Sequence, residues 1–247
     1  MCTVIVHVPE AAAPGAPTAP TRLLAVRDED PARSWDPLGP WWPQAHPGVL
    51  GVRDSRAGGA WLAADPDAGR VAVILNRAEL VDLDESALGS RGHIVLDAVA
   101  GIEPGPRPPV HGFNLVEIDG GGTRVTMWDG ESTRTVSLPP GIHMIAHDDV
   151  DDPATARILT WRDEFAASAA GPADAEQWWT AWLDVLERSA QLDPTDERAI
   201  IRDNRPYGYP TLSLLVTAAS IVDGHADVAY GELDTPGAWN RVALRSV

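Results

Sequence analysis

The chain of 247 residues contains no lysine and only one cysteine, Cys2. The lack of lysine excludes a Schiff-base intermediate and a lysine general base. A single cysteine excludes an internal disulfide and a cluster of thiolate metal ligands, which is typical of a reducing compartment. No apolar run reaches the roughly 18 residues that a membrane-spanning helix needs, and no basic segment precedes a hydrophobic stretch as in a secretory signal. We therefore expect a cytoplasmic protein with no membrane insertion.

Negative charge dominates the composition. The formal net charge is −17 at pH 7, and all 19 basic residues are arginine. A chain this acidic is repelled by phosphate backbones, so we expect no nucleic acid partner. High negative charge can also indicate disorder, but 10 tryptophans and a hydrophobic fraction of 44% predict a packed core.

The pattern of apolar residues predicts strands, then helices, then strands. Continuous or alternating β-branched runs bounded by Gly, Pro and Asp are typical of strands, and a period near 3.6 is typical of helices. Strands are predicted at residues 3–8, 22–28, 49–54, 59–65, 70–76, 111–119, 123–129, 133–138, 211–224 and 225–233. Helices are predicted at residues 90–101, 153–170 and 173–191. This order predicts one layered α+β domain over residues 1–247, with a flexible Ala/Pro-rich loop near residues 9–20.

Cys2 follows directly after the initiator methionine, and this position allows two interpretations. Removal of Met1 would place a thiol and a free α-amino group on one residue, and an amine with a pKa of about 8 can act as the base for the thiol. An activated thiol should then titrate below the value of about 8.5 that is typical of free cysteine. The other interpretation is a buried apolar cysteine at the start of an edge strand, which is common.

Eight short segments occur in an order that resembles a known family. In chain order they are MCTV, LLAVRDEDPAR, WWP, PGVLGVRDSRAGGAWLAAD, RVAVILNR, SRGH, GFNLV and PGIHMIAH. Over residues 1–150 they resemble the successive motifs of the NRDE family, also called the Transport and Golgi organization 2 (TANGO2) family. That family is similar to the cysteine N-terminal nucleophile (Ntn) hydrolases. The resemblance implies an αββα sandwich of two antiparallel sheets flanked by helices.

The resemblance also implies a catalytic set. Cys2 takes the place of the nucleophile. Asp28 stands where an acid would orient the α-amino group of the cysteine, and Arg27 beside it would stabilise a thiolate or a substrate carboxylate. Asn76, at the end of a predicted strand, would donate its side-chain amide to an oxyanion. A strand-end ion pair for Arg27 and Asp28, and a turn position for Asn76, are the structural alternatives.

Three positions depart from the family pattern: Val26 replaces an asparagine of the name motif, His147 replaces a second asparagine, and Pro210 replaces an arginine. His147 could be an oxyanion donor, a general base, or a metal or haem ligand, and a hydrogen-bonded surface histidine is the structural alternative. His143 precedes Ile145 on a predicted strand, so the two histidines would share a face and point into a cavity. The acidic run after His147 lacks the spacing of a calcium loop, and no metal site is predicted.

Two functions remain open. The first is a cysteine Ntn-type amidohydrolase or acyltransferase that acts without a cofactor on a small-molecule amide or acyl substrate, breaking non-peptide carbon–nitrogen bonds. The second is a non-catalytic haem-binding or haem-trafficking protein on the same fold. The family is linked to haem trafficking, and Cys2, His143 and His147 are residue types that ligate haem iron. We rank the hydrolase first, because thiol chemistry is the simplest explanation for a sole cysteine at position 2.

Overall fold

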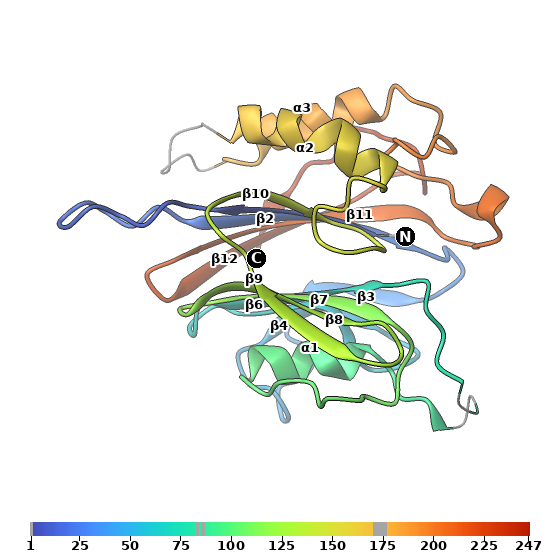
Figure 1. The fold of residues 1–247 in the computed structure, drawn as a ribbon, viewed down its shortest axis with the longest axis horizontal. Coiled ribbons are helices and arrows are strands. Elements are labelled where there is room, and N and C mark those ends of the chain that lie inside the picture. The colour runs from blue at the N-terminus through green and yellow to red at the C-terminus, as the bar shows by residue number, and fades with distance from the viewer. Residues whose placement is uncertain (1, 83, 85–86, 170–176) are drawn as a thin grey trace.

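The structure is a computed structural model that describes residues 2–82, 84, 87–169 and 177–247. Its elements form four layers in the order helices, sheet, sheet, helix (Figure 1). The predicted α+β arrangement of two antiparallel sheets with flanking helices is confirmed. Met1, the last residue of the second predicted helix and residues 173–176 of the third lie outside the described residues.

The first sheet contains both the first and the last strands of the chain. Its strand order is β10-β1-β2-β11-β12-β13. The strands are β1 (Thr3–Val8), β2 (Thr21–Glu29), β10 (Gly141–Ile145), β11 (Leu212–Val222), β12 (His225–Glu232) and β13 (Arg245–Ser246). Because β2 pairs with β1 on one side and with β11 on the other, residues from the two ends of the chain meet around β2.

The second sheet is a meander in which each strand pairs with the next along the chain. Its order is β3-β4-β5-β6-β7-β8-β9. The strands are β3 (Trp35–Gly39), β4 (Leu50–Asp54), β5 (Ala60–Asp65), β6 (Arg70–Asn76), β7 (Phe113–Asp119), β8 (Gly122–Trp128) and β9 (Thr133–Ser137). Short turns with Gly or Asp join several of these strands, whereas the connection from β6 to β7 is long and spans residues 77–112.

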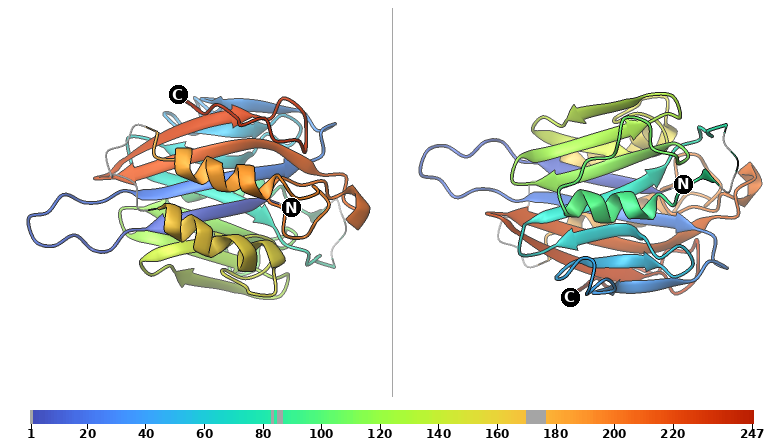
Figure 2. Two further views of the ribbon diagram at one scale, coloured as in Figure 1. Left: turned by 90° about the horizontal axis from the view of Figure 1, so that it is seen from above. Right: turned by 90° about the horizontal axis from the view of Figure 1, so that it is seen from below.

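The helices cover the outer faces of the two sheets (Figure 2). The helices α2 (Ala156–Ser168) and α3 (Thr180–Ser189) lie side by side over the first sheet. The helix α1 (Gly92–Val99) packs against β5 and β6 of the second sheet. No helix within the described part of the chain has both the length and the apolar character to cross a membrane.

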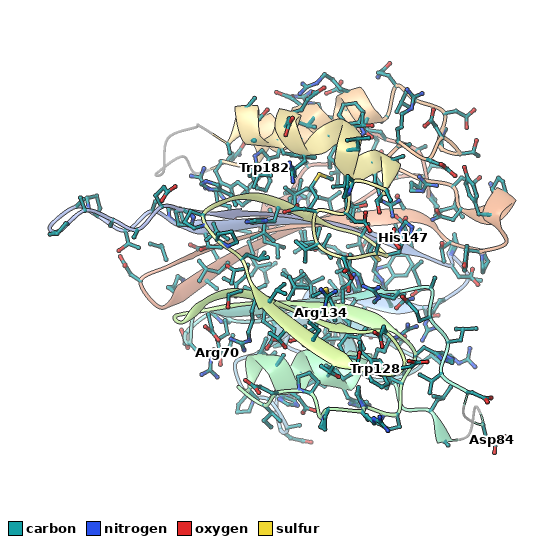
Figure 3. The ribbon with its side chains drawn as sticks, in the orientation of Figure 1. Arg70, Asp84, Trp128, Arg134, His147 and Trp182 are labelled. Carbon is teal, nitrogen blue, oxygen red and sulfur yellow. The ribbon has the colours of Figure 1, made fainter. Side chains whose placement is uncertain are left out.

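Strand alternation divides the core into two layers. Val4 and Leu23 point between the sheets, whereas their neighbours Ile5 and Leu24 point toward α2 and α3. This is the period-two pattern of strands that are buried on both faces. Trp182 of α3 fills the layer between the helices and the first sheet and is only 1% exposed (Figure 3).

The turns follow the sequence prediction. The closing hairpin turns at Asp223 and Gly224, whose φ angles of 50° and 76° are those of a type I′ turn. The Ala/Pro-rich segment joins β1 to β2 as an exposed loop that projects from the sandwich (Figure 1), and its flexibility stays a prediction. The strands β3 and β13 were not predicted, because β3 contains Pro37 and β13 spans only Arg245–Ser246.

Candidate active site

A cleft of about 530 Å³ is lined by residues of both sheets and of the segment that precedes α1. The lining residues are Cys2, Arg27, Asp28, Glu29, Arg33, Asp54, Arg56, Ala57, Ala60, Trp61, Ile74, Asn76, Leu88, Gly89, Ser90, Arg91, Gly92 and His111. The structure therefore brings together four of the five predicted catalytic residues: Cys2, Arg27, Asp28 and Asn76. The fifth, His147, does not line this cleft.

Cys2 lies beside the end of β2, because Thr3 pairs with Val26 across the β1–β2 ladder. The backbone N–H of Asp28 donates to Cys2 Sγ at 3.4 Å, and Sγ lies 3.6 Å from the carbonyl oxygen of Asp28. Burial raises the pKa of the thiol, the charge of Asp28 raises it further, and the opposing effect of Arg27 is smaller. This direction is opposite to the expected lowering, because burial and a neighbouring carboxylate both disfavour the thiolate; the titration of Cys2 after removal of Met1 stays a prediction.

The carboxylate of Asp28 is held by two neutral donors. Ser213 lies directly opposite Asp28 on β11, and its Oγ donates to Oδ1 at 2.6 Å. The amide nitrogen of Asn204 donates to Oδ2 at 3.1 Å. The β2–β11 register shifts between Ser213 and Leu215, and bulges of this kind re-aim side chains next to functional sites. Both oxygens of this buried carboxylate thus have a fixed orientation.

A buried arginine sets the orientation of Asn204. Arg202 Nε donates to Asn204 Oδ1 at 2.9 Å, and Arg202 Nη1 donates to the backbone carbonyl oxygens of Asp196 and Glu197. A guanidinium group only donates hydrogen bonds, so the amide oxygen of Asn204 must face Arg202 and its N–H must face Asp28. Arg202 therefore helps to position Asp28 without touching it.

Arg27 is 3% exposed and lies against the aromatic wall of the cleft. Its guanidinium stacks 5.7 Å from the ring centre of Trp61, and Nη2 pairs with Glu29 at 3.2 Å. Arg27 Nη1 is buried and has no partner within the described residues. The strand-end ion pair therefore exists, although its acid is Glu29 and not Asp28, and Arg27 still lines the cleft.

Asn76 ends β6 and is exposed at the cleft, where its side-chain amide makes no hydrogen bond to the described residues. It is thus available as a donor. Val26, the first departure from the family pattern, is fully buried against the helical layer. Pro210, the third, lines a neighbouring cavity that also contacts Glu29 and Arg33.

His147 contacts the helical layer through Arg157 of α2. Arg157 Nη2 lies 2.9 Å from His147 Nδ1, and His147 Nε2 lies 3.2 Å from Asp148 Oδ2. Because arginine only donates, Nδ1 accepts and the ring proton is on Nε2. Burial, followed by the charge of Arg157, lowers the pKa of His147 to about 4. His147 is therefore a neutral partner of Arg157 at the level of the first sheet (Figure 3).

Arg157 is a buried positive charge whose field acts on Cys2 and Asp28. Its side chain is 2% exposed, and Nε has no partner within the described residues. Burial, followed by the charge of Arg202, lowers its pKa to about 10, while the charges of Asp28 and Cys2 act in the opposite direction. Arg157 is thus electrostatically coupled to both residues, although the expected arginine at position 210 is missing.

His143 and His147 do not fit a haem site in this structure. His143 Nδ1 lies 2.7 Å from Asp151 Oδ2, and His143 Nε2 lies 2.9 Å from the carbonyl oxygen of Pro139. A histidine that ligates a metal keeps one ring nitrogen for the metal and bonds through the other. Both rings use both nitrogens within the protein, and neither lines the cleft with Cys2.

Four residues of the site were not predicted from the sequence. They are Arg91, Arg157, Asn204 and Ser213. Asn204 and Ser213 lie 176 and 185 residues from Asp28 along the chain, and no local pattern connects them to it. Arg91 belongs to the segment SRGH, so this motif was a usable signal for it.

The fold and the cleft define an α+β sandwich protein with a buried cysteine and several arginines at one polar site. The family model described as Transport and Golgi organisation 2 matches residues 1–221, and the chain belongs to this family. The match includes every lining residue of the cleft and also Ser213. A comparison with curated proteins found no match.

Proposed function

We propose that the protein is a cysteine N-terminal nucleophile amidohydrolase or acyltransferase that acts on a small amide or acyl substrate. One observation carries the proposal: Cys2, Asp28 and Asn76 line a single cleft, and the Asp28 carboxylate is fixed by Ser213 and Asn204. A nucleophile, an acid that orients its amine and an oxyanion donor are the parts that this reaction requires.

The reaction begins at Cys2 after removal of Met1. The α-amino group of Cys2 takes the proton from Sγ while the sulfur attacks the substrate carbonyl carbon. Asn76 donates its amide N–H to the oxygen that becomes negative. The carbon–nitrogen bond then breaks, and the departing amine takes the proton. Water adds to the resulting thioester, the sulfur–carbon bond breaks, and the thiol is restored with release of a carboxylic acid. An amine in place of water gives acyl transfer.

The raised pKa of Cys2 defines the kind of activation that this site needs. A buried thiol beside a carboxylate stays protonated at rest. The sulfur must therefore lose its proton during the attack, which makes a positioned base necessary. In this proposal, the Asp28 carboxylate, which Ser213 and Asn204 hold in place, orients that base, the α-amino group of Cys2.

Intact-mass spectrometry and an amidase assay test the proposal together. The mature protein should have the mass of a chain that begins at Cys2, and a panel of small anilides should release aniline in the presence of the wild-type protein. Cys2→Ala should abolish release and keep the wild-type unfolding curve. A mass that includes Met1 would exclude the mechanism. A haem titration is the matching control, and a Soret shift that depends on His143 would favour a carrier.

A further inference from the structure

Arg91 is a cationic side chain in the cleft that forms no ion pair with an acid of the described residues, although the charge of Glu29 acts to raise its pKa. It directly precedes α1, and its Nη1 donates to the backbone carbonyl oxygen of Gly112 at 3.0 Å. Its remaining N–H groups make no hydrogen bond to the described part of the chain. Burial lowers the pKa of Arg91, which reflects the cost of a charge that is partly removed from water. A bound anion would offset that cost.

The other arginines of the cleft differ from Arg91. Arg27 pairs with Glu29 at 3.2 Å, and Arg33 Nε donates to Asp54 Oδ2 at 2.7 Å. Arg56 is exposed to solvent. Arg91 alone among these four is half-buried and has no carboxylate partner in the described residues. In a chain with a net charge of −17, such a group is an unusual feature of a cavity wall.

The backbone around Arg91 is held by close packing of two glycines. A Cβ on Gly59 would lie 2.5 Å from the carbonyl carbon of Gly92, and a Cβ on Gly92 would lie 2.9 Å from the Cα of Gly59. The start of α1 therefore packs directly against the start of β5, with no room for a side chain between them. Arg91 thus projects from a fixed position, which reduces the entropy lost when it binds a ligand.

Two more N–H groups in the cleft wall lack an acceptor within the described residues. They are Arg27 Nη1 and Trp61 Nε1, and both atoms are buried. The wall thus has an excess of donors, which suits a ligand that is rich in acceptor oxygens.

We propose that Arg91 binds a carboxylate group of the ligand, so that the cleft selects amides or acyl compounds that carry a free carboxylate. Guanidinium and carboxylate groups form paired, charge-assisted hydrogen bonds, and Arg91 has N–H groups free for them. Arg91 is then the specificity-determining residue of the proposed hydrolase site. This inference rests on the proposed function for the identity of the scissile amide, but the binding step does not require Cys2.

Binding to the inert Cys2→Ala protein tests this assignment. The probes are N-acetylglycine and succinamic acid, which carry the carboxylate on opposite sides of the amide, together with longer N-acylglycines and the methyl ester of each acid. Isothermal calorimetry should show at least one acid bound tenfold or more tighter than its ester. Arg91→Gln should reduce this ratio to near one, while Arg91→Lys should keep part of it.

Arg70→Gln is the matched control. Arg70, labelled in Figure 3, also donates to a backbone carbonyl, that of Val99 at 3.3 Å, and it is not among the residues that line the cleft. Its replacement removes the same charge and should leave the acid-to-ester ratio unchanged. Equal binding of every acid and its ester, no binding of any acid, or equal losses in the two glutamine variants would overturn the assignment. Tight acid binding without amide cleavage by the wild-type protein would refute the hydrolase and leave the role of Arg91 intact.

Discussion

Replacing His147 with glutamine removes one proton-binding group and keeps its contacts. His147 Nδ1 accepts from Arg157 Nη2, and Nε2–H faces Asp148. A glutamine side chain offers an acceptor oxygen and an N–H donor of similar reach, but it does not titrate. The variant therefore isolates the effect of protonation on the free energy of unfolding.

The magnitude follows from the pKa of His147. Burial and then the charge of Arg157 lower it from 6.5 to about 4, although Asp148 opposes the shift. The unfolded chain takes up the proton below about pH 6.5, whereas the folded chain does so only near pH 4. The stabilising contribution of the neutral ring is thus complete above pH 6.5 and is lost as the pH falls toward 4. At about 1.4 kcal/mol per pKa unit, the wild-type chain loses about 2.5 kcal/mol between pH 7 and pH 4.5 through this group.

Urea unfolding monitored by tryptophan fluorescence at pH 7 and pH 4.5 measures this loss. The difference in free energy of unfolding between the wild type and His147→Gln should change by about 2.5 kcal/mol in favour of the variant at the lower pH. His143→Gln is a control of opposite sign. Burial alone would lower the pKa of His143, but its hydrogen bonds to Asp151 and Pro139 raise it, so its contribution is lost as the pH rises. A difference between the wild type and His147→Gln that is the same at both pH values would refute the reasoning.

Three further substitutions, one of them with a matched glycine control, test the packing and the site. Trp182→Ala should lower the free energy of unfolding by about 3–5 kcal/mol in a urea titration, because Trp182 is 1% exposed in the helical layer. Gly59→Ala should cost about 1–3 kcal/mol by the same measurement, since its Cβ would meet Gly92, while Gly120→Ala, with nothing within 4 Å, should be neutral. Asp28→Asn should lower kcat of the proposed amidase about 100-fold or more in a variant that the thermal midpoint shows to be folded, and an unchanged kcat would exclude a role in orienting the base.

Local sequence patterns predicted most of the strands and helices of the fold. The strands β1 and β2 appear in the sequence as β-branched runs, and α1 appears as an apolar helix that ends at a glycine. The hairpin at Asp223 and Gly224 could be predicted from the sequence, because a tight turn needs positive φ angles at both positions and few residue pairs accept them. The strand β3 was missed because it is short and pairs along one edge of its sheet, where a proline is tolerated.

The candidate site was only partly accessible from sequence. Motif resemblance identified Cys2, Asp28 and Asn76, which the structure places in one cleft. Ser213 and Asn204 could not be assigned in this way, because their contacts with Asp28 depend on the pairing of β2 with β11. Strand pairing between distant segments is a property of the whole sheet and leaves no local periodicity.

The sequence by itself determined the negative charge, and it excluded lysine chemistry and internal disulfides. It also determined the pattern of apolar side chains along the strands that form the two buried sheets. Only the tertiary structure decided the protonation states at the site. The thiol of Cys2 has a raised pKa and His147 is neutral, although the sequence suggested an activated thiol and an exposed or ligating imidazole. The physical reason is that desolvation and nearby charges set a pKa, and both depend on which distant residues pack around the group.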